Sequence, residues 1–321
     1  MIISVVIPTM NKVNLLKRTL AELISQDVGP GQSWEVVVVD DGSTDDTADF
    51  LRIFEAEYQG SNPVLRVVSP GANLGRARAR NLGARNATGC WLLFLDDDIV
   101  PPAGLVKAHL KVLLANPGFG TIGFAVTDPD LVDAPHFHYL DTRGVARLDT
   151  GPAPARFFVT QNAAVPRQAF LSVGGFDEEF SAYGFEDMEV AFRLEDEAKV
   201  KFLALPFPVP RHVHHHTLVQ YLEKKRECGR YSLGRIAELH PARLREMRLH
   251  FVVNTKMEND RALSVRLFRF FADSALGKDF PGWLARWPVR DKFFPRWPSL
   301  YFQMMNLAIL CCFRQGICDP E

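Results

Sequence analysis

The sequence predicts an α/β protein: a doubly wound, mainly parallel sheet with helices on both faces, followed by a helical, basic C-terminal extension. Three observations predict this architecture. Apolar runs alternate with helical patterns over the first 95 residues. These runs lack polar alternation, which is typical of parallel strands that are buried on both faces. Clusters of polar residues follow three of the runs, at the strand ends where sheets of this class bind ligands.

The first strands and helices follow one another in a regular order. We expect strands at residues 2–8, 34–39, 64–68 and 91–95, because each stretch is rich in apolar and β-branched residues. Helices are expected at residues 14–26, 44–58 and 76–86, and the first of them carries leucines at helical spacing on one stripe. Short strands and loops follow from about residue 118, with a helix at residues 186–197, and the chain becomes helical and basic near residue 218.

The composition bounds the class of protein and its compartment. The chain of 321 residues is 47% hydrophobic and 23% charged, which is ordinary for a soluble globular protein and argues against disordered and collagen-like classes. Its five cysteines are odd in number and lack CxxC spacing, which favours a reducing compartment. The first residues form no basic leader, so we expect a cytoplasmic protein without a signal peptide.

Charge is distributed unevenly along the chain. Residues 210–321 hold 19 Lys and Arg against 11 Asp and Glu, a net of +8, whereas the remainder holds 18 against 27, a net of −9. The acidic part suits a site that holds cations. The basic part could face anionic lipid at the inner face of a membrane or an anionic acceptor, or it could be a solvated helical surface. Residues 299–313 are the most apolar stretch, but they are too short to span a membrane, so a packed helix is preferred over an interfacial one.

Three carboxylates, Asp96, Asp97 and Asp98, follow the strand expected at residues 91–95. Such a cluster is costly unless a cation or hydrogen-bond donors compensate its charge. Oxygen ligands favour Mg²⁺ or Mn²⁺, and a divalent ion held by few protein groups usually bridges phosphates. In strand geometry Asp96 and Asp98 point to the same side and can address one ligand. The alternative is an acidic turn in contact with water.

Two further polar clusters suit the other parts of a nucleotide. Asp40 and Asp41 follow the strand at residues 34–39. One carboxylate could accept a hydrogen bond from a nucleobase N–H, and the other could cap the helix that begins near Thr44. Three arginines at alternate positions open the helix at residues 76–86. Guanidinium groups and helix N-termini both suit a diphosphate, although one or two of these arginines are expected to be surface charges.

Together these motifs resemble the family 2 glycosyltransferases, which have the GT-A fold, over residues 2–217. The resemblance is specific because separate motifs occur in the family's order. They are Val6-Ile7-Pro8-Thr9-Met10-Asn11, Val38-Val39-Asp40-Asp41-Gly42-Ser43-Thr44-Asp45, Asn73-Leu74-Gly75 with Ala79-Arg80-Asn81, Phe94-Leu95-Asp96-Asp97-Asp98, Gly174-Gly175-Phe176-Asp177-Glu178, Glu186-Asp187 with Arg193-Leu194, and Val213-His214.

The resemblance implies an inverting transfer of a sugar from a nucleotide-diphosphate donor to an acceptor hydroxyl, with Mg²⁺ or Mn²⁺. It implies a nucleotide-sugar-binding half at residues 1–117 and an acceptor-binding, catalytic half at residues 118–217, with residues 218–321 as the helical extension. It also implies Asp187 as the catalytic base, and Asp98 and His214 as metal ligands. The residues expected at the substrates are Pro8, Thr9 and Asn11 at the nucleoside, Asp41 at the base, Arg76 or Arg80 near the diphosphate or supporting that loop, Asp96 at the ribose, and Asp97, Asn162, Gly175 and Glu186 around them.

Chemistry supports the assignment of Asp187 as the catalytic base and of His214 as a metal ligand. An inverting transfer needs one base to take the acceptor proton while a metal stabilises the departing diphosphate. A carboxylate near Glu186 and a desolvated substrate would have a raised pKa, which helps a base to work near neutral pH. The alternative is that Glu186 and Asp187 only favour the dipole at the start of their helix.

Four histidines, His212, His214, His215 and His216, lie close together in the sequence. Zinc is disfavoured because no cysteines with matching spacing are nearby. We prefer His214 as a single ligand, with His212 as the other candidate.

Three other functions are weighed against the transferase. A sugar-nucleotide pyrophosphorylase would need a glycine-rich basic loop after the first strand, where this chain has Pro8-Thr9-Met10-Asn11, and a nicotinamide enzyme would need a GxGxxG there. A non-catalytic nucleotide-sugar-binding module would not need Asp98, Asp187 and His214 together. The donor nucleotide could be UDP, dTDP or GDP. The expected acceptor is a glycan or a lipid-linked molecule, and no nucleic-acid partner is expected.

Overall fold

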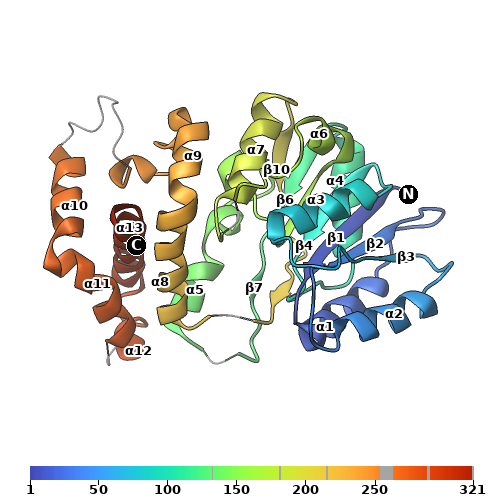
Figure 1. Cartoon of the computed structure of the whole chain (residues 1–321), viewed down its shortest axis with the longest axis horizontal. Coiled ribbons are helices and arrows are strands. Elements are labelled where there is room, and N and C mark those ends of the chain that lie inside the picture. Colours follow the sequence, from blue (N-terminus) through green and yellow to red (C-terminus); the bar gives the residue numbers. More distant parts are fainter. Residues whose placement is uncertain (132, 181, 215, 254–262, 288–289, 320–321) are drawn as a thin grey trace. The chain divides into compact units, whose positions relative to one another are not determined.

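The computed structural model describes residues 1–131, 133–180, 182–214, 216–253, 263–287 and 290–319 (Figure 1). Contacts between residues divide the chain into two compact units. The first unit consists of Met1–Leu131, Asp141–Glu178 and Asp187–His214, and the second of Val132–Leu140, Glu179–Glu186 and His215–Glu321. The first unit contains the main sheet, and the second is mainly helical. The division of function between residues 1–117, 118–217 and 218–321 stays a prediction.

The first unit is built around an eight-stranded sheet in the order β3-β2-β1-β4-β9-β6-β10-β8. Its strands are β1 (Ile3–Thr9), β2 (Glu35–Asp40), β3 (Val64–Val68), β4 (Trp91–Leu95), β6 (Phe119–Ile122), β8 (Gly151–Ala153), β9 (Asn162–Pro166) and β10 (Lys201–Ala204). From β3 to β4 all neighbours are parallel, whereas β9 is antiparallel to both β4 and β6. The carboxyl ends of β2, β1 and β4 therefore lie side by side at one edge of the sheet.

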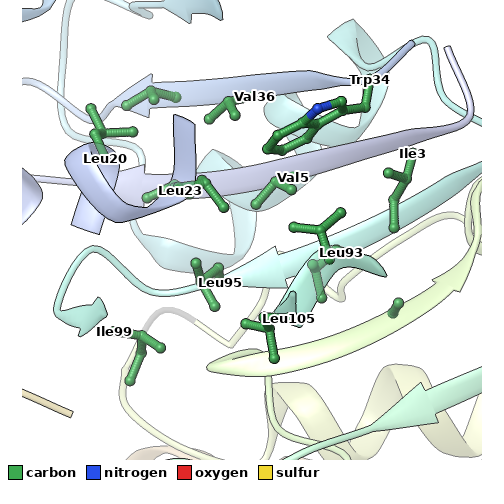
Figure 2. Close-up of a cluster of buried hydrophobic side chains, with 14 of the residues drawn as sticks. Ile3, Val5, Leu20, Leu23, Trp34, Val36, Leu93, Leu95, Ile99 and Leu105 are labelled. Carbon is green, nitrogen blue, oxygen red and sulfur yellow. The ribbon is translucent and has the colours of Figure 1, made fainter. Parts of the chain in front are cut away.

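Helices cover both faces of this sheet, as the sequence predicts. They are α1 (Val13–Ile24), α2 (Thr47–Glu57), α3 (Arg76–Asn86), α4 (Leu105–Ala115), α6 (Arg167–Ser172) and α7 (Glu186–Asp196). On one face, Val5 of β1 joins Leu20 of α1 and Leu105 of α4 in a buried cluster (Figure 2). On the other face α3 comes so close that a Cβ added at Gly83 would lie 2.5 Å from Val6 Cγ1. Successive β1 residues point to opposite faces, so the continuous apolar run serves two cores.

One helix begins later than expected, and the reason is local hydrogen bonding. Helix α2 begins at Thr47 rather than near Thr44. The Thr44 backbone N–H donates to Asn11 Oδ1 at 2.7 Å, and the Thr47 backbone N–H donates to Asp45 Oδ1 at 3.0 Å. Asp40 Oδ1 accepts from the Ser43 backbone N–H at 3.0 Å, within the turn that precedes the helix. The expectation that Asp40 or Asp41 caps this helix is therefore wrong.

A second, three-stranded sheet joins distant parts of the first unit. It has the order β5-β11-β7 and consists of β5 (Ile99–Val100), β11 (Arg211–His212) and β7 (Val126–Thr127). Strand β11 is antiparallel to β5, with His212 opposite Ile99. Because β5 directly follows the acidic cluster at residues 96–98, this pairing places His212 next to that cluster.

The second unit is a set of packed helices. They are α5 (Pro135–Asp141), α8 (Leu218–Glu227), α9 (Leu233–Leu239), α10 (Leu263–Asp273), α11 (Ala275–Arg286), α12 (Arg290–Phe293) and α13 (Pro298–Cys318). The backbones of α13 and α8 are in close contact, since a Cβ added at Gly316 of α13 would lie 2.1 Å from the carbonyl oxygen of Arg226 in α8. Its buried Tyr301 and Met305 confirm the packed helix expected at residues 299–313. Within the described residues, no helix is both long enough and apolar enough to cross a membrane.

Candidate active site

The polar ends of three neighbouring strands form one connected row. The Asp41 backbone N–H, just after β2, donates to the Thr9 carbonyl oxygen at the end of β1, at 2.9 Å. The Thr9 hydroxyl donates to Asp97 Oδ2, just after β4, at 2.8 Å. Predicted substrate residues from three separate motifs thus lie beside one another, because parallel strands present their carboxyl ends at one edge.

A lysine that the sequence analysis missed extends this row. Lys12 Nζ donates to Asp97 Oδ1 and to Asp98 Oδ2, both at 2.9 Å. The two aspartates are buried, whereas the Lys12 side chain is 36% exposed. Lys12 directly follows the Pro8–Asn11 motif, so its place in the loop after the first strand was the available signal. Nothing in the sequence showed that this loop folds back onto residues 97 and 98.

Burial and charge together set the protonation of this cluster. Burial raises the pKa of Asp97 to about 6, although the Lys12 ammonium opposes the shift. Burial alone would also raise the pKa of Asp98, but His212 and Lys12 outweigh it and hold that pKa well below its usual range. Burial alone would lower the pKa of Lys12, but Asp98 and Asp97 raise it above its usual range. At neutral pH Asp98 is therefore a carboxylate that faces one permanent cation.

Histidine reaches the acidic cluster from the small sheet. His212 Nε2 lies 3.3 Å from Asp98 Oδ1, and the Val213 backbone N–H donates to the Asp98 carbonyl oxygen at 3.0 Å. The predicted ligand His214 is the next residue along the chain, and its side chain is exposed. The structure therefore adds His212 as a neighbour of Asp98, and the role of His214 stays a prediction. His215 lies outside the described residues.

Asp96 has a different partner from the one expected. Strand β4 ends at Leu95, so strand alternation does not continue through the acidic cluster. Asp97 and Asp98, rather than Asp96 and Asp98, share one cation. Asp96 Oδ1 accepts instead from Arg80 Nη2 at 2.6 Å. The buried guanidinium of Arg80 thus supports this loop, which is one of the two roles expected for an arginine of α3.

The expected nucleoside residues tie three loops together. Asp41 accepts from the backbone N–H groups of Leu74 at 2.7 Å and Gly75 at 3.0 Å, directly before α3. The Asn11 backbone N–H donates to Ser43 Oγ at 3.0 Å. Pro8 is half-buried within β1, and Arg76 is exposed at the first turn of α3. These contacts hold the loops after β1, β2 and β3 in one arrangement.

Asp187, the expected base, lies at the same edge of the sheet. Its Oδ2 accepts from the Thr160 backbone N–H at 3.2 Å. Thr160 precedes β9, whose first residue, Asn162, is paired with Leu95 at the end of β4. The start of antiparallel β9 is thus next to the carboxyl end of β4. The fold therefore places Asp187 and the acidic cluster near the ends of adjacent strands.

Other expected substrate residues have contacts within the protein. The fully buried Asn162 amide donates to the Phe124 carbonyl oxygen at 3.2 Å, and its Oδ1 lies 2.8 Å from His109 Nε2. Gly175 has φ +76°, and a Cβ there would lie 2.4 Å from Asn81 Oδ1. Glu186, in the second unit, is buried, and its Oε2 accepts from the Gly184 backbone N–H at 3.0 Å. Substrate contact by Asn162, Gly175 and Glu186 stays a prediction.

The buried His109 makes the stability of the fold depend on pH. Its Nδ1 lies 2.7 Å from Thr121 Oγ1, and burial lowers the pKa of His109 from 6.5 to about 4. Below pH 6.5 the unfolded chain binds a proton that the folded protein excludes, so the free energy of unfolding falls until pH 4. The pKa of His109 differs by about 2.5 between the unfolded and the folded chain, and each pKa unit corresponds to about 1.4 kcal/mol. We therefore expect the free energy of unfolding to fall by about 3 kcal/mol.

The measurement is urea unfolding at pH 7 and at pH 4.5. His109→Gln should lose less stability between these two values than wild type does. The exposed His138→Gln serves as the control and should lose as much as wild type. An unchanged pH dependence in His109→Gln would contradict the account of the buried imidazole.

The acidic cluster contains side chains of the types that bind divalent ions. In the part of the chain that the structure describes, no group of three or more His, Cys, Asp or Glu side chains is placed to hold a metal ion. Asp97 and Asp98 nevertheless already share one cation, the Lys12 ammonium, and His212 adjoins Asp98. Carboxylate oxygens suit Mg²⁺ or Mn²⁺. The carboxylates of Asp97 and Asp98 are therefore of the right chemical type for such an ion.

Comparison with known proteins shows what the chain is similar to. The family model described as glycosyl transferase family 2 matches residues 4–174, and one described as the N-terminal domain of galactosyltransferase matches residues 151–217. Validoxylamine A glucosyltransferase from Streptomyces hygroscopicus subsp. limoneus is 33% identical over 220 residues, which are 60% of this chain and 48% of that protein. The chain spans about half the length of this relative and of the validoxylamine A glucosyltransferase from a second subspecies.

Solved structures share the fold at low sequence identity. The mannosyltransferase PcManGT from Pyrobaculum calidifontis, in complex with GDP-Man and Mn²⁺, aligns with a TM-score of 0.64 at 20% identity, over 98% of this chain and 86% of that one. TarS 1–349 from S. aureus, in complex with UDP-GlcNAc, aligns with a TM-score of 0.54 at 16% identity, over 99% and 90%. The GT-A fold is thus confirmed. Because the family model covers more than half of its length, the chain belongs to glycosyl transferase family 2.

Proposed function

We propose that the chain is an inverting glycosyltransferase that moves a sugar from a nucleotide-diphosphate donor to an acceptor hydroxyl, with Mg²⁺ or Mn²⁺. The observation that carries this proposal is the connected row of Asp41, Thr9, Asp97, Asp98 and His212 at the carboxyl edge of the sheet. Family membership supports it. The GDP-Man and UDP-GlcNAc bound by the two structural neighbours support a nucleotide sugar as the donor.

Each part of the row suits one part of the donor. Asp41 keeps lone pairs for a nucleobase N–H while it accepts from Leu74 and Gly75, since a carboxylate has about four acceptor sites. Arg76, at the start of α3, would contact the diphosphate. Asp98, with His212 or His214, would hold the metal, which when bound supplies positive charge that stabilises the departing diphosphate.

Asp187 would take the proton from the acceptor hydroxyl. The Thr160 backbone N–H holds one carboxylate oxygen of Asp187 and so fixes the orientation of the group. A single base on the side opposite the leaving diphosphate permits direct displacement, which inverts the configuration of the sugar. The acceptor class proposed is a glycan or a lipid-linked molecule.

Lys12 should compete with the metal ion for the same carboxylates. We expect Lys12→Met to bind Mn²⁺ at least about tenfold more tightly than wild type, because a divalent ion no longer has to displace an ammonium from Asp97 and Asp98. Titration calorimetry with Mn²⁺ and no nucleotide measures this directly, without any need for turnover.

Two control variants separate charge from other effects. Lys12→Arg keeps the charge and should bind Mn²⁺ much as wild type does. Lys17→Met removes a lysine of α1 that lies over the Phe50 ring, and it should change nothing. Weaker Mn²⁺ binding by Lys12→Met would show that the lysine does not occupy the metal site.

The donor class is tested by a thermal-shift screen of UDP, GDP and dTDP, each with and without Mn²⁺. A ligand that binds only the folded state at 100 times its Kd raises the free energy of unfolding by about 2.7 kcal/mol. We expect one nucleotide to raise the Tm, and to do so only with Mn²⁺. No shift with any of the three would contradict the proposed donor site.

The alternative of an inactive nucleotide-sugar-binding module rests on one observation, the Lys12 ammonium at the two carboxylates. Such a module would bind nucleotide equally well with and without metal. It would also neither hydrolyse nor transfer the sugar. The same screen, followed by an assay for release of the nucleotide diphosphate, distinguishes the two functions.

A further inference from the structure

Two helices of the second unit carry apolar side chains on a face that the core does not use. In α10, Leu263 is 67% exposed, Leu267 is 58% exposed and Phe270 is 79% exposed. Spacings of four and three residues place all three on one stripe of the helix. The buried side chains of α10, Val265 and Ala272, lie about half a turn away. A helix with one face in a core normally has a polar opposite face, and α10 does not.

Exposed apolar side chains also lie on α11, which follows α10 in the second unit (Figure 1). Leu276 is 77% exposed, and Trp283, seven residues further on the same side, is 46% exposed. The Trp283 ring stacks on Phe280 at 5.8 Å and on Trp287 at 5.2 Å between centroids. Tryptophan side chains gather where an apolar phase meets water, as at the surface of a bilayer.

Basic residues accompany the stripe. Between residues 263 and 300 the sequence has seven Lys and Arg against three Asp, a net of +4. Arg266 of α10 and Arg286 of α11 are exposed, and each lies within about a quarter turn of the apolar side chains of its own helix. One of the three acids, Asp273, is paired with Arg314 at 2.9 Å and so adds little negative charge to the surface. Apolar side chains bordered by cations are the pattern of helices that lie in an anionic membrane surface.

We propose that the α10–α11 stripe, defined as Leu263, Leu267, Phe270, Leu276 and Trp283, docks on an anionic lipid bilayer, with the helices in the plane of the headgroups. The absence of a membrane-spanning helix in the described residues is consistent with docking at the surface. A second copy of the chain is a poorer occupant, because a twofold interface would bring this basic face against itself. The proposal does not depend on glycosyltransferase activity.

The test is co-sedimentation of the full chain with vesicles. One preparation contains only phosphatidylcholine, and the other contains phosphatidylcholine and phosphatidylglycerol at three to one. We expect wild type to sediment with the second preparation and to prefer it at least about tenfold. Leu267→Gln/Phe270→Gln should bind at least about tenfold more weakly, because these two side chains would lose their apolar surroundings. Arg266→Gln/Arg286→Gln should lose the preference for the anionic lipid.

Matched controls keep the result interpretable. Ile53→Gln/Leu114→Gln replaces two side chains of the first unit that are 52% and 51% exposed, and it should bind vesicles as wild type does. The mutated side chains of the stripe are exposed, so all variants should keep the wild-type Tm. Wild type that stays in the supernatant, or Leu267→Gln/Phe270→Gln that binds like wild type, would overturn the proposal. So would a dimer in analytical ultracentrifugation that this double variant dissociates.

Discussion

Asp98→Asn should lower kcat/KM by about 10³-fold or more while leaving the fold intact. The Asp98 carboxylate is held ionised between Lys12 and His212, and it is the proposed anchor of the cation that neutralises the leaving diphosphate. Loss of several kcal/mol of charge stabilisation in the transition state corresponds to this factor. Initial rates of nucleotide diphosphate release, measured with the donor from the thermal-shift screen, give the ratio of kcat/KM between wild type and Asp98→Asn.

A surface carboxylate provides the matched control. Asp27→Asn removes a carboxylate that pairs with Lys107 at 3.0 Å on the surface, and it should leave the rate unchanged. Both variants should melt within a few degrees of wild type. Turnover by Asp98→Asn at the wild-type rate would remove Asp98 from the proposed site.

Asp187→Asn should lower kcat by about 10²- to 10⁴-fold with little change in the affinity for the donor. General-base catalysis contributes a factor of this size. The asparagine side chain has nearly the same shape as aspartate, but its amide cannot accept the proton. The amide oxygen can still accept from the Thr160 backbone N–H, so the local contact is retained. Donor affinity is measured by titration calorimetry, and kcat by turnover at saturating donor.

The expected split between kcat and donor affinity separates the base from a binding residue. Asp196→Asn, at the exposed end of the same helix α7, is the control and should change neither quantity. A large loss of donor affinity in Asp187→Asn would place this residue in donor binding rather than in proton transfer. An unchanged kcat would show that another group takes the proton.

The fold was predictable from the sequence because it depends on patterns within short segments. Strand β4 and helix α3 have the predicted bounds, and the continuous apolar run of β1 correctly predicted a strand that is buried on both faces. The meeting of polar strand ends followed from the parallel order of β2, β1 and β4. These features need no knowledge of how loops are arranged.

The contacts of the site were less predictable because they join residues far apart in the chain. Lys12 meets Asp97 only because the loop after β1 folds back across the edge of the sheet. His212 meets Asp98 through a two-residue strand, which is too short to have a sequence pattern. The turn at residues 97 and 98, where strand geometry was assumed, was the other unknown, and it decided which of the three aspartates share a cation.

The most direct measurement is a crystal structure of the chain with Mn²⁺ and the nucleotide diphosphate identified by the thermal-shift screen. Anomalous scattering at the manganese edge locates the ion without relying on the positions of the protein atoms. We predict one strong peak at the Asp98 carboxylate, in contact with the diphosphate, with the Lys12 ammonium displaced from Asp98 and the base beside Asp41. A nucleotide bound away from the carboxyl ends of β1, β2 and β4, or a diphosphate bound there without any manganese peak, would contradict the account.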